Sequence, residues 1–134
     1  MGVLVDSSVL VTYERRGLCP DDLLRRLQED AAISALTVSE LLVGLHHAVT
    51  DEQRTRRQDF IDRMVETMNV FAFDLAVASV HAELWVDLFR RGERIGTADT
   101  IIAATALAKD YAVLTENLRE FQRVPGLEVR QPSW

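Results

Sequence analysis

The amino-acid sequence predicts an α/β fold, a three-layer α/β/α domain built on a mostly parallel sheet of four or five strands. Short apolar runs of strand length alternate along the chain with longer stretches of helical periodicity. The connections between these segments are short, and no internal repeat or linker interrupts the series. Chains of this kind cover both faces of a parallel sheet with helices.

Size and composition favour a single domain over residues 1–134. A chain of 134 residues has the length of an ordinary domain, and 48% apolar residues suit a globular protein. The one cysteine, Cys19, cannot form an internal disulfide, which fits a reducing compartment. The N-terminal residues lack the basic segment of a secretory signal, and no apolar run could span a bilayer. We therefore expect a cytoplasmic chain with no membrane partner.

The first elements are a strand and two helices. Val3–Val5 reads as a short buried strand that ends at Asp6. A helical pattern over residues 7–16 places Val9, Leu10 and Tyr13 on one face, and Gly17 ends it. Pro20 opens a second helix, in which leucines recur at helical spacing.

The middle of the chain repeats the alternation. Ala32–Ala35 is a weaker strand candidate, and Thr37 with Glu40 matches a capping box that would open the next helix. Residues 51–68 predict a long helix with an apolar stripe. Val70–Phe73 reads as a third strand, and Asp74 can cap the helix that follows it.

The last elements complete the sheet. Thr97 can cap a helix that runs through Leu107, and Tyr111–Leu114 reads as a fourth strand. A short helical turn ends at Phe121, and the chain then turns into a last short strand, Leu127–Val129.

Polar side chains cluster where this arrangement would bind a ligand. Asp6 and Asn117 follow apolar strands, while Glu40 and Asp99 lie in the first turns of predicted helices. In open parallel sheets, ligands bind outside the carboxyl ends of the strands. The three acids and the amide are therefore expected to converge on one crevice.

Each of these residues also has a purely structural interpretation. Asp6 could cap the helix that starts at Ser7, and Glu40 could simply complete the capping box. Asp99 could be a first-turn acid favoured by the helix dipole, and Asn117 an ordinary turn residue. The conjunction of all four at one edge of the sheet favours a functional site.

Three carboxylates and an amide suit a hard divalent cation. Mg²⁺ prefers oxygen ligands and is usually held by one or two carboxylates, water and substrate phosphate. Such a metal can generate a hydroxide and stabilise the charge that develops in phosphodiester cleavage. The net charge of −6 counts against a protein that coats nucleic acid, but a metal site needs a cluster of acids.

Four segments resemble the motifs of PIN domains, in the same order along the chain. Val3–Leu10 resembles their opening strand, Asp and hydroxyl pair, and Ile33–Gly44 resembles the segment with the acidic Glu. Ile95–Ala104 and Val113–Phe121 resemble the third and fourth motifs. Length and the residues around Asp99 are most similar to the VapC-type toxins of toxin–antitoxin pairs.

The resemblance implies a PIN fold and an endoribonuclease that depends on Mg²⁺ or Mn²⁺ and cleaves structured RNA such as tRNA or rRNA. It implies metal binding by Asp6, Glu40 and Asp99, with the hydroxyl of Thr115 near the site. It also implies inhibition by a cognate VapB-type antitoxin and assembly as a homodimer.

Asn117 stands at the fourth position, where many PIN domains have Asp. Two alternatives follow: a second metal binds weakly, or the neighbouring Glu116 partly substitutes. A second hypothesis is a non-catalytic PIN-like module that binds RNA or protein. A third is a phosphohydrolase with Asp6 as nucleophile, although such enzymes commonly have a second Asp where this chain has Ser8.

Overall fold

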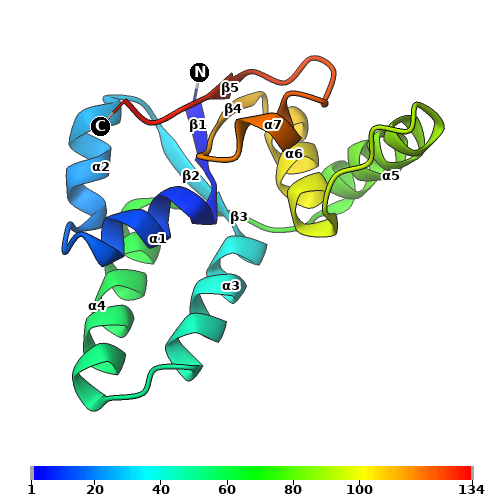
Figure 1. The fold of residues 1–134 in the computed structure, drawn as a ribbon. Coiled ribbons are helices and arrows are strands. Elements are labelled where there is room, and N and C mark those ends of the chain that lie inside the picture. Colours follow the sequence, from blue (N-terminus) through cyan, green and yellow to red (C-terminus); the bar gives the residue numbers. More distant parts are fainter. Residues whose placement is uncertain (1, 134) are drawn as a thin grey trace.

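The computed structural model describes residues 2–133 and contains a five-stranded sheet in the order β3-β2-β1-β4-β5 (Figure 1). All neighbouring strands pair in parallel. The strands are β1 (Gly2–Val5), β2 (Ala31–Ser34), β3 (Asn69–Phe71), β4 (Tyr111–Leu114) and β5 (Val129–Arg130). The predicted α/β class, three layers and parallel sheet are confirmed.

Helices lie on both sides of the sheet (Figure 1). They are α1 (Ser7–Arg15), α2 (Pro20–Leu27), α3 (Ala35–His46), α4 (Asp51–Thr67), α5 (Leu75–Arg90), α6 (Thr97–Lys109) and α7 (Leu118–Phe121). Side chains from α1, α2 and α4 share one core cluster, and side chains from α5, α6 and α7 share the other. In Figure 1, α3 and α4 form a helical hairpin that projects beyond the sheet.

The side-chain alternation of β1 creates these two cores. Val3 and Val5 belong to the cluster with α1, α2 and α4, whereas Leu4 belongs to the cluster with α5, α6 and α7. All three side chains are fully buried, because successive residues of a strand point to opposite faces and both faces are covered. This explains why the strand is continuously apolar.

The start of α3 differs from the prediction. Strand β2 ends at Ser34, whose hydroxyl accepts a hydrogen bond from the backbone N–H of Leu36 at 3.1 Å, so Ser34 is the N-cap. The predicted capping box of Thr37 and Glu40 is therefore wrong. Thr37 is a fully buried residue within the first turn, and Glu40 lies in the second turn. Ser34 and Thr37 are both residues that can cap a helix, and the helix begins at the earlier one, directly after β2.

Other boundaries shift by one to three residues. Gly96, not Thr97, is the N-cap of α6, and β3 begins at Asn69 and ends at Phe71. Strand β5 is Val129–Arg130 rather than 127–129, because the backbone N–H of Thr115 pairs with the carbonyl of Arg130 at 3.0 Å. The predicted cap at Asp74 is confirmed, with its carboxylate accepting from the N–H of Val77 at 2.9 Å.

The order of the strands fixes the position of a ligand site. From β1 the chain continues to β2 on one side, and β4 pairs with β1 on the other. Crossover connections therefore run in opposite directions from the centre of the sheet. The strand order therefore reverses between β1 and β4, which makes the carboxyl ends of these two strands a topological switch point. Open α/β sheets bind ligands at such a point. Within residues 2–133, no helix is both long and apolar enough to cross a membrane.

Candidate active site

Asp6 is the most buried acid of the site. It directly follows β1 and is only 6% exposed. Although Asp6 occupies the N-cap position of α1, its side chain makes no capping hydrogen bond. Instead, its Oδ2 accepts from the Ser8 hydroxyl at 2.9 Å and from the Thr115 hydroxyl at 2.8 Å. The capping interpretation of Asp6 is therefore wrong, because two hydroxyl groups hold the carboxylate instead.

Thr115 connects Asp6 to the loop after β4. Its side chain is completely buried, and its Oγ1 donates to Asp6 while it accepts from the backbone N–H of Asn117 at 2.9 Å. The Asn117 side chain in turn donates from Nδ2 to Oδ2 of Asp99 at 3.4 Å. A continuous series of hydrogen bonds thus links Asp6 and Asp99, which are far apart in the sequence, through Thr115 and Asn117.

Asp99 lies in the first turn of α6, as predicted. Partial burial, with the negative charges of Asp6 and Glu120 nearby, raises the pKa of Asp99 to about 6. The N-terminus of a helix normally stabilises a carboxylate. At Asp99, desolvation and the repulsion by other acids act in the opposite direction and raise the pKa.

Glu40 reaches the same region from the second turn of α3. The residue remains accessible to solvent. Loss of surrounding water nevertheless raises the pKa of the Glu40 carboxyl, the charges of Asp6 and Asp99 raise it further, and a hydrogen bond from Ser7 opposes the rise. Because Asp6 and Asp99 both act on Glu40, the three predicted acids are electrostatic neighbours.

These residues line one open cleft of about 410 Å³. Its walls come from α1, α3, the start of α6 and the loop after β4: Asp6, Ser7, Ser8, Val11, Thr12, Arg15, Glu40, Ala98, Asp99, Ile102, Glu116 and Asn117. The sequence-predicted acids and Asn117 are all present, and Thr115 lies directly behind them. Among residues 2–133, no ion pair involves Asp6, Glu40 or Asp99.

Among the residues of α1 that line the cleft, Ser8, Thr12 and Arg15 were not singled out as site residues from the sequence. Ser8 donates to Asp6 and accepts from the backbone N–H of Glu116 at 3.1 Å. Thr12 donates to the Glu116 carboxylate at 2.9 Å. Arg15 stands one turn further along the helix. Their spacing of three to four residues was the available signal, since it places polar side chains on one face of a helix whose other face is apolar.

The donor set fits a hard cation only with help from other ligands. Within the described residues, no three His, Cys, Asp or Glu side chains are grouped closely enough to hold an ion by themselves. However, among residues 2–133, Oδ1 of Asp6 has no hydrogen-bond partner, and the carboxylates of Glu40 and Asp99 have no cationic partner. Mg²⁺ commonly takes one or two carboxylates and completes its shell with water and phosphate. The residues are compatible with that mode.

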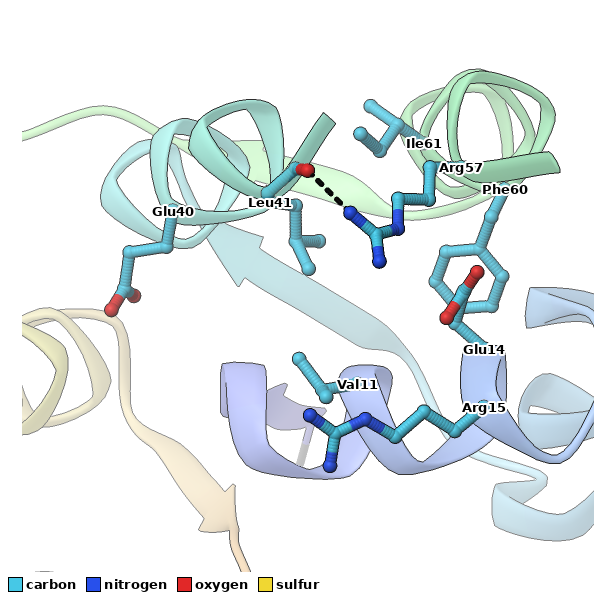
Figure 2. Close-up of a pocket in the computed structure, with 9 residues that line it drawn as sticks. Val11, Glu14, Arg15, Glu40, Leu41, Arg57, Phe60 and Ile61 are labelled. Atoms are coloured by element: carbon cyan, nitrogen blue, oxygen red, sulfur yellow. Dashed lines mark hydrogen bonds between the residues drawn. The ribbon is translucent and has the colours of Figure 1, made fainter. Parts of the chain in front are cut away.

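A second cavity of about 220 Å³ adjoins the cleft between α1, α3 and α4 (Figure 2). It shares Val11, Arg15 and Glu40 with the cleft. Its remaining lining is mostly apolar and includes Leu41, Phe60 and Ile61. Figure 2 shows the Arg57 guanidinium across this cavity, where it donates to the carbonyl of Gly44 at 2.6 Å.

Comparisons with known proteins agree with the fold and the motifs. Residues 3–127 match the PIN domain family. Ribonuclease VapC1 of Rickettsia felis is 31% identical over 129 residues, which cover 96% of this chain and 95% of that protein. The tRNA(fMet)-specific endonuclease VapC of Shigella flexneri is 32% identical over 107 residues, covering 80% of this chain and 77% of that protein.

A similar fold occurs in the crystal structure of VapBC2 from Rickettsia felis bound to a DNA fragment from their promoter. The TM-score is 0.86 at 23% identity, with 99% of this chain and 100% of that chain covered. The sequence matches and the fold lead to the same assignment. The chain belongs to the PIN-domain family and, within it, to the VapC group.

Proposed function

We propose that this protein is an endoribonuclease dependent on Mg²⁺ or Mn²⁺ and the toxin component of a toxin–antitoxin pair. The observation that carries the proposal is the meeting of Asp6, Glu40 and Asp99 in one cleft, where they repel one another and form no ion pair with any of the described residues 2–133. Mutual repulsion among carboxylates destabilises a fold unless a cation is bound. Function is the simplest reason to maintain such an arrangement.

The names of the relatives support the choice of RNA as substrate. The similar Rickettsia felis protein is a ribonuclease, and the Shigella flexneri protein is a tRNA(fMet)-specific endonuclease. We infer that this chain cleaves structured RNA, either tRNA or rRNA, in the cytoplasm. An open cleft suits an exposed loop, since sequence-specific recognition of RNA mostly targets unstacked bases.

The metal would be held by Asp6 together with Glu40 or Asp99. When bound, it would supply an activated water and neutralise charge that develops on the phosphate. Thr115 and Ser8 fix the Asp6 carboxylate by two hydrogen bonds to one oxygen, which leaves the other oxygen available. Asn117 orients Asp99 through its amide and, being uncharged, adds no further repulsion.

The partners follow from the family. The similar solved structure is a VapBC complex, and we infer that a VapB-type antitoxin inhibits this chain. We also propose that the chain forms a homodimer. Both proposals are tested by co-purification of the chain with the product of the neighbouring gene, followed by measurement of the mass of the chain and of the complex in solution.

The direct test in cells is expression without a partner. The wild-type chain and Asp99→Asn are each expressed from a tightly controlled promoter, and growth and total RNA are recorded. We expect the wild type to arrest growth with discrete RNA fragments and the variant to be harmless. Equal growth in both cultures, with both proteins soluble and folded, would remove the support for catalysis.

Two observations favour a second candidate, a non-catalytic module that binds RNA or protein. An amide replaces a carboxylate at position 117, and the described acids do not by themselves enclose an ion. This candidate predicts no heat of Mn²⁺ binding in calorimetry. A binding isotherm that is lost in Asp6→Asn would instead exclude it in favour of the metal site.

A further inference from the structure

Arg15 is the basic residue that lines the acidic cleft. It lies in the last turn of α1, and the cleft around it contains Asp6, Glu40, Asp99 and Glu116. It also lines the adjoining cavity, and Figure 2 shows its side chain extending alongside Val11. No other Arg, Lys or His lines the cleft among residues 2–133. Its position therefore separates it from the other exposed arginines.

The Arg15 guanidinium has no partner among the described residues, whereas two of its charged neighbours are held in place. Glu14 forms an ion pair with Arg56 at 3.3 Å, and Arg57 donates to a backbone carbonyl. Arg15 is exposed and has no hydrogen bond or ion pair among the described residues. An unpaired guanidinium beside a group of acids is available to a ligand that carries negative charge.

RNA, the proposed substrate, carries the negative charge that an unpaired guanidinium at position 15 can bind. An RNA strand that enters the cleft carries one negative charge per nucleotide toward carboxylates that repel it. A guanidinium presents a rigid fork of donors that matches two phosphate oxygens. A bound metal would offset the repulsion at the reacting phosphate, and the Arg15 guanidinium would hold an adjacent phosphate.

We propose that Arg15 binds a backbone phosphate of the substrate RNA next to the cleaved bond and thereby positions the strand in the cleft. This inference rests on the proposed ribonuclease function. The structural alternative is that Arg15 only interacts with the helix dipole at the end of α1. Arg16 provides the matched control, because it caps the same helix, is exposed, and lines neither cavity.

The experiment compares Arg15→Ala, Arg15→Lys and Arg16→Ala in the full chain. Binding of bulk bacterial tRNA is measured by fluorescence anisotropy, in the Asp99→Asn background, over a series of KCl concentrations. Arg15→Ala should weaken binding about tenfold, the size expected for a charge-assisted hydrogen bond. The slope of log K against log salt should fall by about 0.7, which corresponds to one phosphate of a single strand. Arg15→Lys should restore the slope, and Arg16→Ala should change neither quantity.

Cleavage kinetics provide the second readout. With an otherwise wild-type site, Arg15→Ala should raise KM by about the same factor and leave kcat nearly unchanged, since the contact forms with substrate and transition state alike. If the wild type cleaves RNA and Arg15→Ala equals Arg16→Ala in both assays, the inference is overturned. It is also overturned if Arg15→Ala only prevents neutralisation by the antitoxin. If the wild type cleaves no RNA, the proposed function fails, and the salt slope alone decides whether Arg15 binds phosphate.

Discussion

At the scale of single residues, the site depends on how one buried carboxylate is held. Oδ2 of Asp6 accepts two hydrogen bonds, one from the hydroxyl of Ser8 within α1 and one from the hydroxyl of Thr115 after β4. These donors come from elements that only the folded sheet brings together. The sequence could predict Asp6, Asp99 and Asn117, because each follows a strand or opens a helix. The spacing of Ser8, Thr12 and Arg15 places them on one face of α1, but only the packing of α1 in the folded sheet turns that face toward the cleft.

Replacement of Thr115 by Val tests this support. Valine has the same shape but removes the donor to Asp6 and the acceptor for the N–H of Asn117. We expect the free energy of unfolding to fall by about 1 to 3 kcal/mol and RNA cleavage to fall at least tenfold. Thr115→Ser retains both hydrogen bonds and should keep most of the activity. Urea denaturation and initial cleavage rates measure both effects, and a fully active Thr115→Val would contradict the role of this hydroxyl.

The raised pKa of Asp99 predicts a dependence of stability on pH. The folded state binds the Asp99 proton more tightly than the unfolded state, because the pKa rises from 3.8 to about 6. The resulting stability is therefore present below about pH 4 and is lost as pH rises through about 6. In metal-free buffer at pH 7.5, Asp99→Asn should melt about 4 °C higher than the wild type, a shift already reduced for solvent screening.

The same comparison at pH 4 should show almost no difference in Tm between wild type and Asp99→Asn. Asp59→Asn is the control, since Asp59 is exposed on α4, outside the cleft. Thermal melts followed by circular dichroism give all the values. A wild type that is more stable than Asp99→Asn at pH 7.5 would show that Asp99 is not under repulsion.

At the scale of elements, the start of α3 determines where Glu40 lies. The helix begins at Ala35, with Ser34 as its cap, so Glu40 faces the cleft from the second turn rather than closing a capping box. Sequence alone could not distinguish the two starts, because Ser34 and Thr37 are both good capping residues. The difference has a functional consequence, since a Glu40 committed to a cap would not be available to a metal.

Two substitutions distinguish these starts. Ser34→Ala should lower the free energy of unfolding by about 1 kcal/mol, because it removes the capping acceptor of Leu36. Thr37→Val should be neutral or stabilising, since the buried hydroxyl of Thr37 has no hydrogen-bond partner among the described residues. Urea denaturation provides both values. A larger loss in Thr37→Val than in Ser34→Ala would restore the capping box.

At the scale of the whole molecule, the fold brings distant segments to one switch point. The alternation of strands and helices was enough to predict the layers and the parallel sheet, because a continuously apolar strand such as β1 must be covered on both faces. The order of the strands in the sheet could not be predicted, since the sequence pattern does not indicate which apolar strands pair with each other. Short edge strands such as β5 were misplaced because backbone pairing, rather than hydrophobicity, defines them.

We propose that the acids of the cleft hold a metal ion on which RNA cleavage depends. This dependence is tested by incubation of the purified chain with bacterial RNA in Mg²⁺ or Mn²⁺, with and without excess EDTA, beside Asp6→Asn. We expect discrete fragments from the wild type with metal, none in EDTA, and none from a folded Asp6→Asn. Equal cleavage in excess EDTA, or by Asp6→Asn, would contradict it.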